Sequence, residues 1–217
     1  AIIHVVRAFD DENVMREQGR ESDFVDPLAD IDTINLELIL ADLDSINKRY
    51  ARVEKIARTQ KDKDAVLEFK VLEQIKPVLE AGKSARTVDF EDDELKVVKS
   101  LFLLTTKPVL YVANVSEDAV GDPENIAYVK QIRDFATTEN ADTVVISARV
   151  EEEIAELEQD EKLEFLEAIG LTESGIDKLT QVAYHLLGLG TYFTAGEKEV
   201  RAWTFKRGIK APGAAGI

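Results

Sequence analysis

The stretch "VLYVANVSEDAVG", from Val109 to Gly121, decides the fold. An apolar run of β-favouring residues stops abruptly at Asn114, and an acid, Glu117, follows three residues later. Such a run is typical of a buried strand, and parallel α/β sheets bind ligands at the carboxyl ends of their strands. There an asparagine can brace a loop and offer its amide to a purine edge, and a carboxylate can accept hydrogen bonds from base N–H groups. Asn114 and Glu117 are therefore candidates for reading a nucleotide base, with an ordinary Asn/Ser turn as the alternative.

The segments that follow continue this pattern. A helix is predicted over 126–139, a second buried strand over 141–148, and helical segments over roughly 150–168 and 174–188. Alternating strands and helices predict a parallel sheet covered by helices, which is the α/β class. The second strand ends at Ser147 and Ala148, a Ser-Ala pair of the kind whose backbone closes over a base, and an ordinary strand end is the alternative.

The first residues, "AIIHVVRAF" (1–9), predict another buried strand. His4 is expected to pack in the core rather than bind a metal, because His185 is the only other histidine and no ligand cluster supports a site. A domain seldom begins on a central strand, so the sequence is expected to be a piece of a longer protein.

The bulk composition is that of a soluble globular protein with room for a sizeable core, at 217 residues, 45% hydrophobic and 32% charged. No cysteine is present, which excludes disulfides and thiolate metal sites and fits a reducing compartment such as the cytoplasm. A run of about 18 apolar residues, as a membrane span needs, does not occur. The net charge of −16 argues against non-specific nucleic-acid binding by the whole surface.

A pair of helices is predicted between the first strand and Val109. Apolar residues at alternating steps of three and four form a heptad pattern, typical of a helix packed along a partner: Leu36, Ile39, Leu43, Ile46, Tyr50, Val53 and Ala57. After a polar break at 59–64, a second apolar stripe follows: Ala65, Phe69, Leu72, Ile75 and Leu79. We expect an antiparallel coiled-coil hairpin, although so regular a pattern could also serve a dimer. A third helix is predicted over 91–106.

The turn of this hairpin is basic. Between Asn47 and Lys63, seven cations face two acids, Glu54 and Asp62, so the local charge is 7 − 2 = +5. The cations are Lys48, Arg49, Arg52, Lys55, Arg58, Lys61 and Lys63. One interpretation is a solvated helix face. The other is a polyanion-binding surface that meets phosphates without reading sequence.

A short motif, "EAGKSART" (80–87), resembles the end of a phosphate-binding loop. That loop requires a preceding strand and an earlier glycine, so that backbone N–H groups can wrap the phosphates. Here the earlier position is Pro77 and the preceding segment is predicted to be helical. Gly82 is therefore interpreted as a helix stop.

Several stretches in order resemble the YchF group of Obg-like ATPases, within the translation-factor-related P-loop NTPases: "HVVRAF", "VDPLADIDTINLELILADLD", "KPVLYVANVSED", "ISARVEEEIAEL", "FLEAIGL" and "TYFTAGEKEVRAWTFKRGIKAP". The resemblance spans essentially the whole chain. It implies a partial P-loop NTPase-type parallel sheet with an inserted α-helical coiled-coil hairpin and the start of a β-grasp TGS domain. The implied domains are 1–32 and 107–188 for the rear of the nucleotide-binding G domain, 33–106 for the helical insert, and 189–217 for a truncated TGS domain.

The resemblance also implies a site. The family favours ATP over GTP and has the base motif Asn-x-x-Glu, which places Asn114 and Glu117 at the base, Val115 as a backbone contact, and Ser147 and Ala148 at the closing loop. In GTP-binding domains the acid is an aspartate that takes both guanine N–H donors. Glu117 is one methylene longer, so guanine preference should weaken.

The family's phosphate loop and Mg²⁺ ligands precede the equivalent of "AIIHVVRAF", so they are expected outside this sequence. We accordingly expect the chain alone to have little nucleotide affinity and no turnover.

Two classes of function stay open. As an enzyme, the parent protein would hydrolyse ATP with Mg²⁺. As a non-catalytic module, the basic hairpin would contact the ribosome or structured RNA, with slight support from a basic C-terminal stretch: Lys198, Arg201, Lys206, Arg207 and Lys210. Trp203 in that stretch is expected to be β-grasp core rather than a stacking platform. Neither a membrane nor DNA is expected as a partner, and the expected location is cytoplasmic.

Overall fold

The computed structural model describes residues 1–11, 25–59, 62–197, 199–214 and 216. Lys61 and Lys198 of the predicted basic sets lie outside these residues. The chain divides into two compact units: residues 28–108 with Ile2 form the helical unit, and Ala1, 3–27 and 109–217 form the α/β unit. Within the described ranges, no helix combines the length and the apolarity that crossing a bilayer requires.

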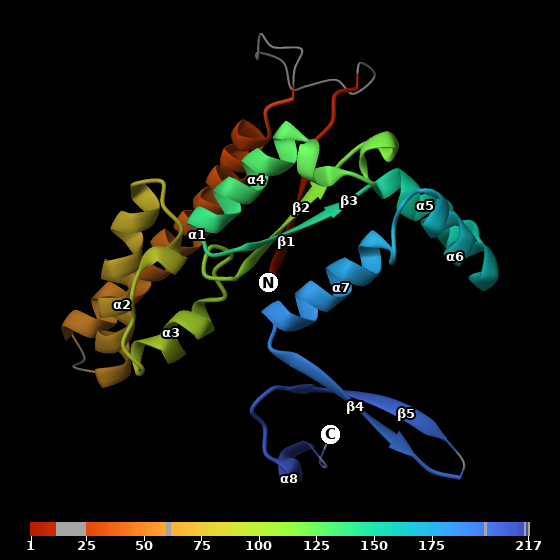
Figure 1. The fold of residues 1–217 in the computed structure, drawn as a ribbon. Helices are drawn as coiled ribbons and strands as arrows, with labels where there is room; N and C mark the ends of the chain where they lie inside the picture. Colours follow the sequence, from red (N-terminus) through yellow and green to blue (C-terminus); the bar gives the residue numbers. More distant parts are fainter. Residues whose placement is uncertain (12–24, 60–61, 198, 215, 217) are drawn as a thin grey trace. The chain divides into compact units, whose positions relative to one another are not determined.

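The α/β unit is built on a parallel sheet. In the described residues it has three strands, in the order β1 (Ile2–Arg7), β2 (Val109–Asn114) and β3 (Asp142–Ile146). β2 and β3 run parallel, with Val112 opposite Val144. β2 lies between its two neighbours, which explains why all its residues before Asn114 are buried. The α/β class predicted from the alternation of strands and helices is confirmed (Figure 1).

Helices cover both faces of this sheet, with α4 (Ala127–Thr138) above β3 and α7 (Gly175–Leu186) below it in Figure 1. Strand side chains alternate between faces, so Val144 and Ile146 pack on α7, whereas the Tyr111 ring meets Phe135 of α4 edge-on at 5.7 Å. The helical stretch predicted near 150–168 is two helices, α5 (Ala148–Glu156) and α6 (Gln159–Ala168). They are separate because α6 begins with its own capping box.

The prediction of a buried strand over residues 1–9 holds for one side-chain row only, and the strand itself is β1, Ile2–Arg7. In β1 only alternate side chains are buried: His4 and Val6 lie inside, while Ile3 and Val5 are 49% and 58% exposed. The reason is that on this face the α7 side chains pack on β2 and β3, at Leu110, Val112, Val144 and Ile146, so the Ile3–Val5 row of the outer strand β1 is left largely uncovered. The prediction of a core histidine is confirmed, because the buried His4 ring lies 5.5 Å from the Tyr111 ring.

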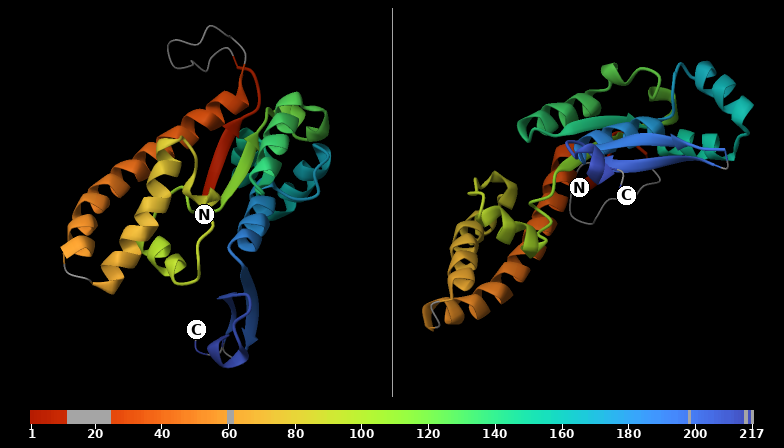
Figure 2. Two further views of the ribbon diagram at one scale, coloured as in Figure 1. Left: turned by 90° about the vertical axis from the view of Figure 1, so that its left-hand side faces the viewer. Right: turned by 90° about the horizontal axis from the view of Figure 1, so that it is seen from below.

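The helical unit contains the predicted antiparallel hairpin. Helices α1 (Pro27–Thr59) and α2 (Lys63–Glu80) run side by side in opposite directions (Figures 1 and 2). Tyr50 and Phe69 stack across the pair with ring centres 5.0 Å apart. The shared core is made of Ile39, Ile46, Val53, Val71, Leu72, Ile75 and Leu79, with Ala85, Val98 and Leu103 from the segments that follow.

One end of the predicted heptad pattern does not pack. Leu36 is 51% exposed, whereas Ile39, Ile46 and Val53 are buried as predicted. The antiparallel register explains this, since Asn47 bonds Lys76 and a residue near Leu36 would face a point beyond Glu80, where α2 ends. The pattern was correct in period and wrong in extent.

The ends of α2 and α3 are set by local chemistry. Asp62 caps α2 by accepting hydrogen bonds from the N–H groups of Asp64 and Ala65. Gly82 follows α2 with φ +71°, so its interpretation as a helix stop is confirmed. The third helix, α3 (Glu94–Leu101), is shorter than the predicted 91–106, because Phe102 adopts a left-handed conformation with φ 54°.

A buried acid, Asp42, joins α1 to the chain just before β2. Its carboxylate is 3% exposed and accepts three hydrogen bonds, from Leu104 N–H at 2.8 Å and from the N–H and hydroxyl of Thr105, both at 2.7 Å. The heptad reading missed Asp42, because an acid between Ile39 and Ile46 looks like a solvent position. It holds residues 104 and 105 against α1 within the helical unit.

A second buried acid, Glu94, joins α3 to α2. It is 2% exposed and accepts from Glu91 N–H at 3.0 Å, from Gln74 Nε2 at 2.8 Å and from Lys70 Nζ at 2.9 Å. The Glu91 N–H, followed by the Lys70 ammonium, holds the pKa of Glu94 below its usual value.

The C-terminal residues form a hairpin of β4 (Leu189–Ala195) and β5 (Val200–Lys206), followed by the short helix α8 (Ala211–Ala214). Trp203 is half-buried, donates from Nε1 to Thr194 Oγ1 at 2.9 Å, and lies under the Arg201 guanidinium at 4.3 Å. Short 3-10 turns occur at Ala85–Thr87 (η1), Glu117–Ala119 (η2) and Pro123–Asn125 (η3).

Candidate functional site

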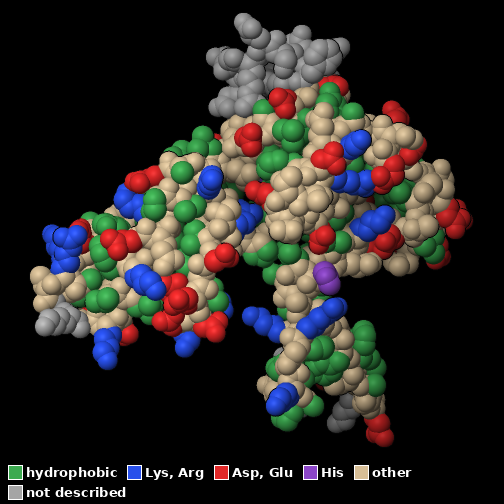
Figure 3. Space-filling model, turned by 60° about the vertical axis from the view of Figure 1, so that its left-hand side comes forward, with side chains coloured by type: hydrophobic (Ala, Val, Ile, Leu, Met, Phe, Trp, Pro, Cys, Tyr) green, Lys and Arg blue, Asp and Glu red, His purple; other side chains and the backbone are tan. Residues whose placement is uncertain are grey.

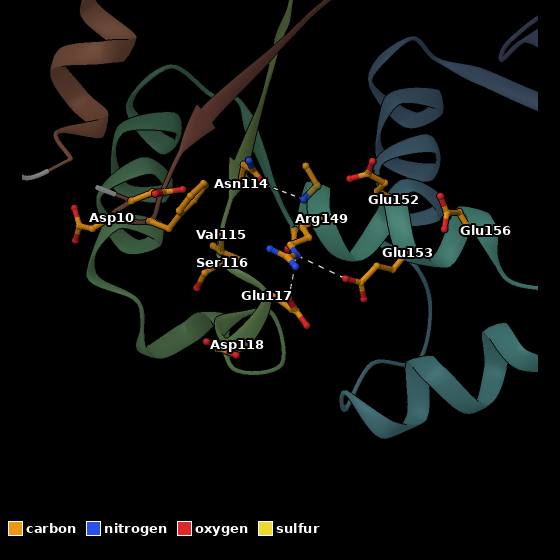
Figure 4. Close-up of a pocket in the computed structure, with 14 residues that line it drawn as sticks. Asp10, Asn114, Val115, Ser116, Glu117, Asp118, Arg149, Glu152, Glu153 and Glu156 are labelled. Carbon is orange, nitrogen blue, oxygen red and sulfur yellow. Dashed lines mark hydrogen bonds and ion pairs between the residues drawn. The ribbon is translucent and has the colours of Figure 1, made fainter. Parts of the chain in front are cut away.

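A cavity of about 970 Å³ opens at the carboxyl ends of the strands of the α/β unit (Figure 4). Parallel strands end at one edge of a sheet, and this is where open α/β sheets bind ligands. The five residues predicted for base binding all line it. The full lining is Phe9, Asp10, Asp11, Asn114, Val115, Ser116, Glu117, Asp118, Ser147, Ala148, Arg149, Glu152, Glu153 and Glu156.

Asn114 connects the two predicted halves of the site. Its Oδ1 accepts a hydrogen bond from the backbone N–H of Ala148 at 2.9 Å, so the end of β2 braces the turn that follows β3. This bond occupies the side-chain oxygen and leaves the Asn114 amide nitrogen to donate to a ligand. The backbone N–H of Val115 is already bonded to Ile146 at 2.8 Å, so Val115 has only its carbonyl oxygen to offer.

Glu117 begins η2 at the rim of the cavity, where its carboxylate is paired with Arg149 (Figure 4). The distance from Arg149 Nε to Glu117 is 3.3 Å, and the same nitrogen lies 3.6 Å from Glu153. All three side chains are substantially exposed, so water screens these ion pairs and each can open to admit a ligand. Sequence reasoning missed Arg149, although it directly follows the predicted Ser147-Ala148 pair.

Ser147 has a polar group without a partner. The residue is 1% exposed, and in the described part of the chain its hydroxyl has no hydrogen-bond partner. Most buried side-chain hydroxyls in folded proteins are bonded, so such a group at a cavity wall is suited to a ligand. Close to Ser147, α5 is joined to the start of α7, because Glu151 of α5 accepts a hydrogen bond from Gly175 N–H at 2.7 Å.

The charge of the cavity restricts what it can hold. Its lining contains the seven acids Asp10, Asp11, Glu117, Asp118, Glu152, Glu153 and Glu156, with Arg149 as the one cation among these lining residues. Such a lining suits the N–H groups of a base and repels phosphate oxygens. The lining can therefore accept hydrogen bonds from N–H groups of a ligand and is unfavourable for anions.

The predicted polyanion-binding residues lie on α1 of the helical unit, in a region where Lys and Arg mix with Asp and Glu (Figure 3). Three are ion-paired: Lys48 with Asp44, Arg49 with Glu68, and Arg58 with Glu54. The pair with Glu68 raises the pKa of Arg49. Arg52 and Lys55 are exposed and have no partner among the described residues, so they are the cations that are available to a phosphate.

The sheet is parallel, its Asn-x-x-Glu and Ser-Ala strand ends meet at one cavity, and a long helical hairpin lies between β1 and β2 along the chain. This is the fold class of a partial P-loop NTPase-type domain. A family model described as YchF-GTPase_C, Protein of unknown function (DUF933), matches residues 189–217. The chain is 57% identical over 217 residues to a Bacillus subtilis (strain 168) protein named Ribosome-binding ATPase YchF, covering all of this chain and 58% of that protein.

Two further comparisons agree. The chain is 34% identical to Obg-like ATPase 1 of Caenorhabditis elegans, covering 100% of this chain and 54% of that protein. A solved structure, that of the Schizosaccharomyces pombe YchF GTPase, superposes with a TM-score of 0.83 at 32% identity, over 100% of this chain and 57% of that one. The chain is therefore homologous over its whole length to YchF proteins and spans somewhat over half of theirs, and the resemblance read from the sequence is confirmed.

Proposed function

We propose that this chain carries the base-binding part of an ATP site in a protein that hydrolyses ATP and associates with the ribosome in the cytoplasm. The observation that supports it best is the hydrogen bond from Ala148 N–H to Asn114 Oδ1, which joins the two base motifs at the wall of one cavity. The names of the relatives, Ribosome-binding ATPase and Obg-like ATPase, agree with this function.

The groups on the cavity wall complement adenine. The adenine amine donates hydrogen bonds and its ring nitrogens accept them. Glu117 supplies a carboxylate for the amine, and the amide nitrogen of Asn114 is a donor for a ring nitrogen. Ser147 supplies a hydroxyl that has no other described partner. Guanine would need both its N–H donors in the plane of one carboxylate, which an aspartate reaches better than the longer Glu117.

The phosphates and Mg²⁺ need other groups. Among the described residues no cluster of three or more His, Asp or Glu side chains is placed to hold a metal ion. The acidic lining of the cavity does not favour phosphate oxygens either. Base binding by Asn114, Val115, Glu117, Ser147 and Ala148 does not depend on the metal, and hydrolysis requires phosphate-positioning groups that these residues do not supply.

The proposal is tested by the relative affinity for ATP and GTP. The test protein is a fusion in which this chain replaces the matched 58% of the Bacillus subtilis relative. Glu117→Asp should raise GTP affinity relative to ATP by about tenfold, the effect of one hydrogen bond to a charged group. Glu153→Asp shortens another acid beside Arg149 and is the control. If calorimetric titration gives the same ATP/GTP ratio in all three proteins, Glu117 does not read the base.

A second function, contact of the helical unit with ribosomal or other structured RNA, is favoured by Arg52 and Lys55, which are exposed and have no partner among the described residues. Changing both to Gln should make the slope of log affinity against log salt shallower, by about 0.7 to 0.9 per lost phosphate contact. The control changes Lys48 and Arg58, which are already ion-paired. If the salt dependence of ribosome affinity and the helicity both stay unchanged, Arg52 and Lys55 contact only solvent and no phosphate.

A further inference from the structure

The outer edge of β3 offers unpaired backbone groups. β3 is the last strand of the described sheet, and Ile146 C=O accepts from Val115 N–H of the β2 side at 2.8 Å. Backbone groups of successive strand residues point to opposite sides, so the N–H and C=O of Thr143 and Val145 point away from β2. In the part of the chain that the structure describes, nothing bonds to them.

A second cavity lies along this edge. It measures about 440 Å³ and is lined by Thr143, Val144 and Val145, together with Arg133 of α4 and Lys178 and Val182 of α7. The two helices cover opposite faces of the sheet (Figure 1), and loop residues within 120–124 and 170–175 line the cavity beside the strand edge as well. A strand edge beside a helix is the geometry in which an extended peptide adds to a sheet as a further strand.

Two side chains in this cavity also lack partners. The hydroxyl of Thr143 is buried and has no hydrogen-bond partner among the described residues. Lys178 has none either, whereas Arg133 is paired with Glu124, and Glu173 accepts from Gln181 at 2.9 Å. The charges of the lining balance, with Arg133 and Lys178 against Glu124 and Glu173. What has no partner among the described residues is a row of backbone groups, the Thr143 hydroxyl and the Lys178 ammonium.

An extended peptide with an acidic side chain supplies partners for all three. We propose that the β3 edge binds such a segment of a partner protein as an added strand, with the acid facing Lys178. Natural sheets protect unused edges with charged residues, proline or bulges. Neither of the outward-facing residues, Thr143 and Val145, is charged or proline. The site is distinct from the base cavity and does not rest on nucleotide binding.

The test uses the 217-residue chain and, as probe, a displayed library of random peptides of about eight residues, long enough for one strand. Enriched peptides should carry an acid within an otherwise β-favouring sequence. A synthetic copy should slow amide hydrogen exchange at Thr143 and Val145 when it binds. Lys178→Glu should weaken it, whereas Lys162→Glu on α6 should not.

Val145→Pro is the decisive variant. It removes an N–H that faces away from β2, so the sheet survives, as proline is tolerated on edge strands. Peptide affinity should fall by about tenfold or more. Val145→Thr keeps the N–H and the side-chain shape, and should bind like the unsubstituted chain.

Thr143→Val separates binding from folding. It removes a buried hydroxyl without a described partner, so the free chain should melt at a higher temperature while the peptide binds more weakly. Failure of the library to yield a binder, or equal binding by Val145→Pro, would overturn the proposal. Concentration-dependent dimerisation that disappears in Val145→Pro would assign the edge to a second copy of the chain and overturn it too.

Discussion

Both compact units contain buried polar groups that are bonded, but among the described residues the buried ones without a partner all belong to the α/β unit. In the helical unit, Asp42 and Glu94 are nearly inaccessible, and each accepts three hydrogen bonds. In the α/β unit, the hydroxyls of Ser147 and Thr143 are buried with no described partner. A fully bonded polar group holds one conformation, whereas an unbonded one raises the energy of the free protein until something supplies its partner. The first kind identifies the scaffold, and the second identifies places for ligands.

Removing a fully bonded acid should have the largest effect. Asp42→Ala leaves three donors of Leu104 and Thr105 without an acceptor, so the free energy of unfolding should fall by about 3 kcal/mol or more. The measurement is urea unfolding followed by helical circular dichroism. Asp44→Ala, on the same helix, removes an exposed acid paired with Lys48 and should cost under about 0.5 kcal/mol. Equal losses would mean that Asp42 is not a special contact.

Acid should weaken the helical unit through Glu94. Its pKa is lowered on folding, first by Glu91 N–H and then by Lys70. Its contribution is therefore complete above the unfolded value of about 4.3 and is lost as pH falls through the lower folded pKa. Between about pH 6 and pH 3, urea unfolding should show a steeper loss for the unsubstituted chain than for Glu94→Gln.

The control for this pH series is Glu91→Gln, which changes an exposed side chain and keeps the backbone N–H that Glu94 uses. Its pH profile should follow the unsubstituted chain. A Glu94→Gln profile parallel to both would show that this carboxylate does not contribute to acid sensitivity.

The smallest changes in stability should come from two serines, one with an unbonded hydroxyl and one whose hydroxyl caps a helix. Ser147→Ala removes an unbonded hydroxyl, so the stability of the free chain should hold or rise by up to about 1 kcal/mol. Ser174→Ala removes the cap that accepts from Asp177 N–H at 3.1 Å and should cost about 1 kcal/mol. Thermal unfolding of both variants compares them directly. A loss in Ser147→Ala as large as in Ser174→Ala would show that its hydroxyl is bonded.

Local patterns were sufficient for much of the fold. The apolar run at β2, the period of the α1–α2 hairpin and the stop at Gly82 were all readable, because each depends on neighbouring residues. The exposure of Leu36 and Val5 was not, since it depends on where a partner element ends. Asp42 was missed for the same reason: its partner Thr105 is 63 residues away.

The candidate site also has features that the sequence predicts and features that it does not. The sequence order of two strand ends places Asn114 near Ala148 because parallel strands end together, although 34 residues separate them. The pairing of Arg149 with Glu117 and the unbonded Ser147 hydroxyl depend on side-chain directions that no sequence period encodes.

The contact between Asp42 and Thr105 also has a consequence for the order of folding. β1 and β2 are neighbours, and Ala8 N–H bonds Asn114 C=O at 2.7 Å, yet the whole helical unit lies between them in the chain. Closing so long a loop is entropically costly and slow. The hairpin of α1 and α2 is local and can form early. The bond of Asp42 to Thr105 then holds the chain four residues before β2 against α1, so the segment left to close between the two strands is mainly residues 8–26.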